Sequence, residues 1–175
     1  MDKDVKKIQS LDWGDLARLW QKIESAKTPG WAAGKALELL ILRAFQLSNA
    51  EVIWPFNVKV EGNVLEQIDG VVYAEGLTVL CESKDYSTSV NFEPIAKLRQ
   101  QISRRPPAVI GSCFSRNGFT TEAIMLTQRC SPQNVLLWHG EEIEFAIHQR
   151  NMTAALATKY RKMVEYAVPD FKINI

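Results

Sequence analysis

The alternation of apolar and polar positions divides the chain into helical and strand-like segments. Near the N-terminus, apolar residues recur at helical spacing up to about Ser25, and AKTPG then interrupts the pattern with Pro29 and Gly30. A second helix is predicted over residues 31–47, where apolar residues keep the same period. The sequence therefore begins with helix, turn and helix.

The middle of the chain carries the short apolar runs that are typical of β-strands. The residues AEGL at 74–77 predict a tight hairpin between two of these runs, and the double proline at 106–107 ends a helix. After the second helix, the predicted elements are strands 51–60, 67–74 and 77–84, helix 93–103, strand 108–114, helix 118–130 and strand 134–140. Residues 140–168 are predicted to form one or two further helices.

This order of elements predicts an α/β protein with a central mixed sheet flanked by helices. Three consecutive strands form an antiparallel meander, and helix 93–103 is a crossover to a further strand. A chain of 175 residues can bury one substantial core but is short for two domains. We expect one domain with an N-terminal helix (1–28), a core (31–139) and a C-terminal helical segment (140–170).

Composition narrows the class of protein. The sequence is 46% hydrophobic and 23% charged, which is ordinary for a globular domain. The first residues lack the apolar stretch of a signal peptide, and no apolar run has the length of a membrane span, so a cytoplasmic protein without a membrane partner is expected. Cys81, Cys113 and Cys130 are far apart and are expected to be small buried residues rather than a disulfide or zinc site.

Charge gives a further restriction. A net charge of +1 argues against a protein that coats nucleic acid through bulk charge, so any DNA contact must come from local patches. One basic cluster lies at Lys97, Arg99, Arg104, Arg105 and Arg116. A second, at Lys159, Arg161 and Lys162, is explained equally well as a solvated helix face.

Two carboxylates and a lysine are predicted to meet at one end of the sheet. Asp69 begins strand 67–74 while Glu82 and Lys84 end strand 77–84, and a hairpin places those ends side by side. Glu82 and Lys84 are two residues apart, so both point to the same face. Carboxylates bind Mg²⁺, and a lysine can position or deprotonate a water, as phosphodiester hydrolysis requires. The competing interpretation is a turn-capping aspartate and a surface ion pair.

Glu38 favours the catalytic interpretation of this cluster. Its helical neighbours include Ile41, Leu42 and Phe45, so its carboxylate lies within or beside the apolar stripe of helix 31–47. A charge on that side of a helix needs a partner. The alternative is a boundary glutamate whose carboxylate extends to water.

Together these residues resemble a known superfamily. GKALELL in the helix, IDG at the strand start, and ESK thirteen positions after Asp69 resemble the restriction-endonuclease-like PD-(D/E)XK nucleases, especially the Mrr-type branch, over roughly residues 31–115. Ile68 stands where the motif has proline. The resemblance implies a three-layer fold and a catalytic set of Glu38, Asp69, Glu82 and Lys84. It also implies that Asp69, Glu82 and Glu38 hold Mg²⁺, with Mn²⁺ as a substitute, and that Lys84 serves the attacking water.

Candidate DNA contacts lie beside this cluster. Lys97, Gln100 and Arg104 are on helix 93–103, and Arg116 follows strand 108–114. An ordinary amphipathic helix and a solvated loop explain them nearly as well. Trp54 and Phe56 either stack on bases or, more commonly for aromatic residues on a half-buried strand, belong to the core.

The sequence therefore predicts a metal-dependent DNA endonuclease that acts in restriction of foreign DNA or in DNA repair and recombination. Two alternatives stay open: a catalytically inactive nucleic-acid-binding or assembly protein of the same fold, and an RNA-processing nuclease. Recognition of a strict DNA site would call for a homodimer, because so small a domain has no visible module for reading sequence.

Overall fold

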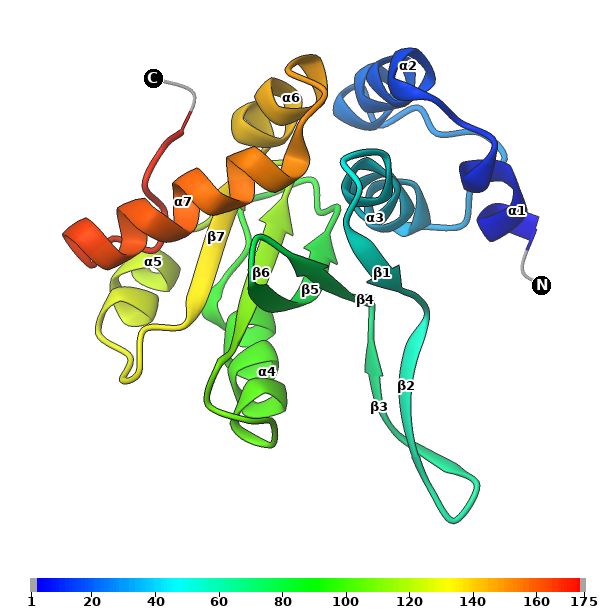
Figure 1. Cartoon of the computed structure of the whole chain (residues 1–175). Coiled ribbons are helices and arrows are strands. Elements are labelled where there is room, and N and C mark those ends of the chain that lie inside the picture. The colour runs from blue at the N-terminus through cyan, green and yellow to red at the C-terminus, as the bar shows by residue number, and fades with distance from the viewer. Residues whose placement is uncertain (1–2, 174–175) are drawn as a thin grey trace.

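A five-stranded mixed sheet forms the centre of the computed structural model, which describes residues 3–173 (Figure 1). Its strand order is β1-β4-β5-β6-β7, with β1, β4 and β5 antiparallel and β5, β6 and β7 parallel. The strands are β1 (Glu51–Ile53), β4 (Gly70–Ala74), β5 (Leu77–Lys84), β6 (Val109–Ser115) and β7 (Val135–His139). The predicted mixed sheet is confirmed.

Helices cover both faces of this sheet. Helices α2, α3, α6 and α7 pack on one face, and α4 and α5 pack on the other (Figure 1). The helices are α1 (Lys3–Gln9), α2 (Trp13–Glu24), α3 (Lys35–Leu47), α4 (Phe92–Ser103), α5 (Thr121–Gln128), α6 (Gly140–His148) and α7 (Met152–Tyr166). Among residues 3–173, no helix combines the length and apolar character needed to cross a membrane.

The alternation of side chains along β5 decides which residues face which helical layer. Val79 and Cys81 pack into the core beneath α3, whereas Leu80 packs into the core beneath α4. Because side chains alternate along a strand, Glu82 and Lys84 share the α4 side with Leu80. Cys81 and Cys113 are both buried free thiols, so burial raises the pKa of each well above its usual value.

The N-terminal helix predicted over residues 1–28 is in fact two helices among the described residues, and the next helix begins later than expected. Asp12 caps α2 by accepting a hydrogen bond from the Asp15 backbone N–H at 2.9 Å, and the Asp15 side chain accepts from the Asp12 N–H in return. Helix α3 starts at Lys35 because Gly34 has a positive φ of 74°, a conformation that glycine adopts without strain.

Strand predictions 51–60 and 67–74 were each too long. Pro55 has no N–H to donate to a sheet, and the chain leaves the main sheet there. Strands β2 (Phe56–Val60) and β3 (Asn63–Ile68) pair with each other as a separate two-stranded sheet, and the chain re-enters the main sheet at Gly70. We call residues 56–68 the arm, because Figure 1 shows this hairpin projecting away from the body.

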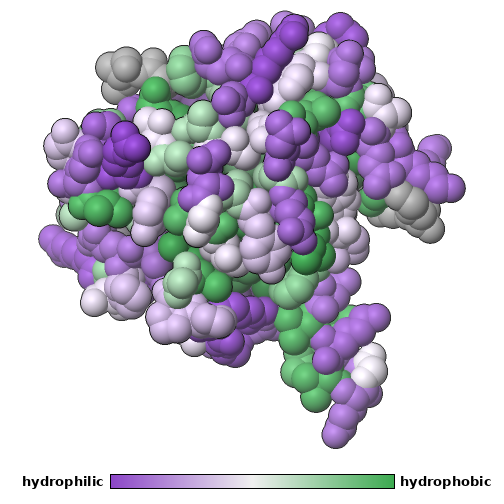
Figure 2. Space-filling model, viewed as in Figure 1, coloured by the Kyte–Doolittle hydropathy of each residue, from purple (hydrophilic) through white to green (hydrophobic). Residues whose placement is uncertain are grey.

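The arm exposes apolar side chains among polar ones and is fixed at its base. Val60, Val64 and Leu65 are at least half exposed, and the projection in Figure 2 carries green, hydrophobic surface beside purple, hydrophilic surface. At the base, Glu66 forms ion pairs with Arg104 and with Arg105. The arm is therefore tied to the end of α4 while its tip extends into solvent.

A buried ion pair joins α6, α7 and the C-terminal segment. The Lys159 ammonium lies 2.6 Å from Glu142 Oε1, and both side chains are fully buried. Lys159 also donates to the Phe171 carbonyl at 2.8 Å, and Glu142 accepts from the His139 N–H at 3.0 Å. The prediction that Lys159 belongs to a solvated or DNA-contacting basic face was therefore wrong, because its ammonium is buried and paired with Glu142.

Candidate active site

The hairpin between β4 and β5 brings Asp69 to the end of β5. Glu75 and Gly76 turn the chain with positive φ values of 53° and 75°, and Gly70 pairs with Cys81 at the other end of the hairpin. Asp69 occupies the single position between β3 and β4, and its Oδ2 accepts a hydrogen bond from the Ser83 N–H at 2.7 Å. The predicted proximity of Asp69 to the Glu82–Lys84 segment is confirmed.

Glu82 is a buried carboxylate with one occupied and one unoccupied oxygen. The residue is 1% exposed. Its Oε1 accepts a short hydrogen bond from Lys84 Nζ and lies 3.8 Å from Lys97 Nζ. Its Oε2 is buried without a hydrogen-bond partner among the described residues. Burial of an unpaired charged oxygen is unfavourable, so this oxygen is suited to receive a cation.

Glu38 approaches the cluster from the opposite helical layer. Helix α3 packs so closely on β4 that a Cβ at Gly70 would lie only 2.6 Å from Leu42 Cδ2. Both Glu38 oxygens accept hydrogen bonds from Lys35 Nζ, at 2.6 and 2.8 Å. A partner for Glu38 was predicted from the sequence without being identified, and the structure shows that this partner is Lys35.

The three carboxylates influence one another electrostatically. Burial, followed by the charges of Glu82 and Glu38, raises the pKa of Asp69 from 3.8 to about 7. Burial also raises the pKa of Glu38, with Glu82 adding to the shift and Lys35 opposing it. Burial alone would lower the pKa of Lys84, but its hydrogen bond to Glu82 and the charges of Glu82 and Asp69 raise it overall. Negative charge is thus concentrated at this end of the sheet.

The donor set suits a divalent cation held by two carboxylates. Within residues 3–173, no group of three or more His, Cys, Asp or Glu side chains is positioned to hold a metal ion by itself. The three-carboxylate site that the resemblance implies is therefore not preassembled, because Lys35 holds Glu38. Mg²⁺ commonly needs only one or two carboxylates, with water and substrate phosphate completing its coordination. Asp69 and the unpartnered oxygen of Glu82 fit that requirement.

The raised pKa of Asp69 gives a measurable pH dependence. Since its folded pKa exceeds its unfolded pKa, ionisation of Asp69 destabilises the metal-free protein, and this cost grows as pH rises from about 4 to 7. The variant Asp69→Asn avoids that cost. We expect its melting temperature in EDTA to match that of the wild type near pH 4 and to exceed it increasingly up to pH 7. A constant difference across this range would contradict the assignment.

Helix α4 places only part of the predicted DNA-contact set near the carboxylates. Lys97 lies beside Glu82, and Gln100 is exposed one turn further along. Arg104, seven residues and thus about 10 Å beyond Lys97 along the axis, pairs with Glu66 of the arm. Arg104 therefore holds the arm, and its predicted DNA contact has no support from this geometry.

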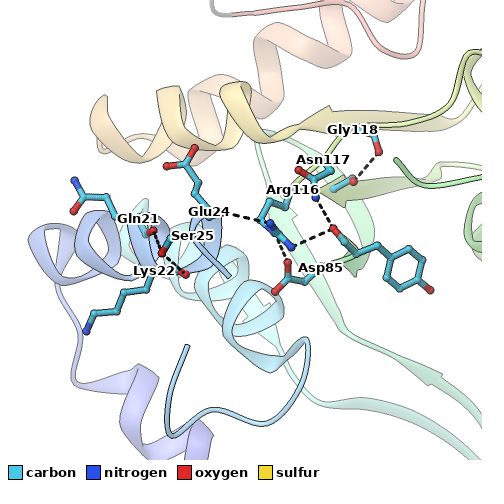
Figure 3. A network of polar contacts seen from close by, with 10 residues as sticks. Gln21, Lys22, Glu24, Ser25, Asp85, Arg116, Asn117 and Gly118 are labelled. Carbon is cyan, nitrogen blue, oxygen red and sulfur yellow. Dashed lines mark hydrogen bonds and ion pairs between the residues drawn. The ribbon is translucent and has the colours of Figure 1, made fainter. Parts of the chain in front are cut away.

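Arg116 is fixed within a network at the carboxyl ends of β5 and β6 (Figure 3). Its guanidinium donates to Asp85 at 2.5 Å and to the Tyr86 and Glu24 carbonyls at 3.2 and 3.4 Å. Asn117 also donates to the Tyr86 carbonyl, at 2.6 Å. Arg116 therefore braces the strand ends against α2, and its guanidinium is occupied by protein groups rather than presented to a phosphate.

Two hollows flank the carboxylates. One, of about 460 Å³, lies on the α4 side and is lined by Glu82, Lys84, Tyr86 and Lys97 among others. The other, of about 430 Å³, lies between α1, α3 and the β1–β2 connection, and Glu38 and Lys35 line it together with Trp54. The first is rich in charged groups, whereas the second offers more apolar surface.

Comparison with known proteins finds solved structures of similar fold. The sequence matches no protein-family model and no curated protein sequence at a significant level. The structure is similar to the DNA modification-dependent restriction endonuclease AspBHI, with a TM-score of 0.50 and 12% identity over 86% of this chain. It is also similar to the MspJI restriction endonuclease, solved with a 27-mer oligonucleotide, with a TM-score of 0.45 and 20% identity over 97% of this chain.

These similarities concern the fold. The chain spans 40% of the length of AspBHI and 39% of that of MspJI. The central five-stranded mixed sheet with helices on both faces is the restriction-endonuclease-like fold, as the sequence predicted.

Proposed function

We propose that this protein is a metal-dependent DNA endonuclease. The observation that carries the proposal is the cluster at the end of β4 and β5, where Asp69, Glu82 and Lys84 meet and Glu82 keeps a buried oxygen without a partner. The similarity in fold to AspBHI, which is named a DNA modification-dependent restriction endonuclease, supports DNA as the substrate. The spacing of Asp69 and the ESK residues supports the Mrr-type branch.

Each residue of the cluster has a distinct proposed role. Asp69 and Glu82 would hold Mg²⁺, or Mn²⁺ in its place, and such an ion supplies charge neutralisation at the phosphate and a more acidic bound water. Lys84, fixed by Glu82, positions the attacking water and stabilises negative charge that develops on the phosphate oxygens. Lys97 lies at the exposed side of the same cluster and contacts the DNA backbone. Glu38 supports the site electrostatically and becomes a ligand only if Lys35 releases it.

The test is a cleavage assay with the purified full chain. Supercoiled plasmid, linear duplex, branched DNA and RNA are incubated separately with Mg²⁺, Mn²⁺ or EDTA, and products are resolved on denaturing gels. We expect DNA to be cut with either metal and to stay intact in EDTA, since two carboxylates alone offer no electrophile.

The other outcomes separate the alternative functions. Cleavage of RNA alone would replace the proposal with an RNA-processing nuclease. Binding of DNA without cleavage under any metal condition would identify a catalytically inactive binding protein. A role in restriction predicts cutting of intact foreign duplex, whereas a role in repair or recombination predicts a preference for the branched substrate.

A further inference from the structure

The hollow on the α3 side of the carboxylates differs in chemistry from the one beside Lys97. We call it the Trp54 groove. It is lined by Trp54, Leu39 and Val52, which provide aromatic and aliphatic surface, and by Gln9, Lys35 and Glu38, which provide polar groups. Its volume of about 430 Å³ lies within the range of roughly 300–1,000 Å³ that is usual for small-ligand pockets.

This combination of groups suits a nucleobase. A flat aromatic ring stacks on an indole, aliphatic side chains cover its edge, and an amide such as that of Gln9 can pair with its polar atoms. Trp54 is half-buried, with one part packed against the core beneath α3 and the rest lining the groove. Because the core contact already holds the ring in place, binding of a base carries little entropy cost for ordering the Trp54 side chain.

The position of the groove connects it to the proposed catalytic cluster. Glu38 lines the groove, and its charge interacts with those of Glu82 and Asp69, while Glu82 lines the charged hollow on the other side. A DNA strand bound across this end of the sheet would therefore contact lysines on one side of the carboxylates and an aromatic groove on the other. Lysines suit phosphates, and the groove suits a base of the same strand.

We propose that the Trp54 groove binds an unpaired nucleobase next to the phosphate that is cut. The inference rests on the proposed nuclease function and specifies its substrate: DNA with an unpaired nucleotide, as in a flap, bulge or damaged site. A base held in a duplex cannot enter such a groove without leaving its stack, and this costs least where the base is already unpaired. A partner protein or a second copy would need a broader apolar surface than this groove presents.

The first test measures binding without catalysis. Full-length Lys84→Ala protein in EDTA is titrated into duplex DNA that carries 2-aminopurine either in a one-nucleotide bulge or paired at the same position. We expect binding to quench the fluorescence of the unpaired base alone. In the Lys84→Ala background, the further substitution Trp54→Leu is expected to remove the quenching. It is also expected to weaken binding of the bulged DNA about tenfold, which is the contribution of one base–aromatic stack.

Matched controls separate stacking from damage to the fold. Trp31→Leu removes another half-buried tryptophan that packs on the same core and forms a cation–π contact with Lys7, but that does not line the groove. We expect Trp31→Leu to leave the preference for bulged DNA unchanged. Gln9→Ala removes an exposed groove residue without touching the core, and is expected to reduce that preference by a smaller factor. Melting temperatures identify any variant that has lost its fold.

The second test measures cleavage and distinguishes two kinds of failure. Wild-type protein with Mg²⁺ should cut bulged or flapped DNA faster than perfect duplex, and Trp54→Leu should lower that ratio. If no DNA is cut but the binding preference and quenching are present, the nuclease proposal fails while the base-binding groove stands. If both DNAs are cut and bound equally by wild type and Trp54→Leu, the nuclease proposal stands and the groove is not a base site.

Discussion

Replacing Lys84 with alanine is expected to lower the rate of DNA cleavage about 10²- to 10⁴-fold, the usual contribution of a positioned catalytic acid–base group. Lys84 donates a hydrogen bond to Glu82 and lines the charged hollow from the same strand. Without it, the attacking water loses its partner and the developing charge loses a neighbouring ammonium. Single-turnover cleavage of a labelled duplex in Mg²⁺ measures the effect.

Two further variants make this result interpretable. Asp69→Asn removes a proposed metal-binding oxygen while preserving side-chain volume, and it should lose a comparable amount of activity without losing stability in EDTA. Lys59→Ala, on the exposed arm, removes a lysine outside the cluster and should cleave at the wild-type rate. Full activity in a folded Lys84→Ala protein would exclude the proposed role of this lysine.

Replacing Lys159 with methionine is expected to destabilise the protein by about 3–5 kcal/mol, the usual cost of breaking a buried ion pair from one side. The variant keeps most of the side-chain volume but leaves Glu142 buried without its cation. It also removes the donor to the Phe171 carbonyl, which helps hold the C-terminal segment. Urea unfolding followed by tryptophan fluorescence gives the change in the free energy of unfolding.

The comparison variants test whether the uncompensated charge causes the loss. Lys162 forms a partly exposed ion pair with Glu165 on the same helix, at 2.9 Å, and Lys162→Ala should lower the free energy of unfolding far less than Lys159→Met does, because exposed ion pairs contribute little. The double variant Lys159→Met/Glu142→Gln should be more stable than Lys159→Met alone, because no buried charge is left unpaired. A double variant that is less stable by the sum of both single changes would contradict this explanation.

The part of the site that depends on one hairpin was predictable from sequence. Strand 77–84 was predicted with its observed limits, and the period of two along it places Glu82 and Lys84 on one face. The turn at Glu75 and Gly76 then aligns Asp69 with the end of that strand. Local rules sufficed because all three residues lie within sixteen positions of one another.

The rest depended on contacts between distant segments or on a missed local signal. The burial of Lys159 and the ion pair of Arg116 with Asp85 arise from packing between separate elements. A cluster of basic residues in the sequence does not show which of them will be buried or paired. The pairing of Lys35 with Glu38 was visible as a helical spacing of three. Glu61 and Gly62 repeat the Glu–Gly turn at 75–76, and together with Pro55 they could have predicted the arm.

The arm has a consequence for how the protein opens locally. A two-stranded hairpin is marginally stable in water by itself, and the contacts that support the arm lie near its base, among them the ion pairs of Glu66 and the hydrogen bond from Gln101 to the Gln67 carbonyl. Backbone amides near the tip should therefore exchange with solvent deuterium far faster than those of β5. The pairing of β2 and β3 near the tip can therefore open and re-form while the carboxylate end of the central sheet keeps its geometry.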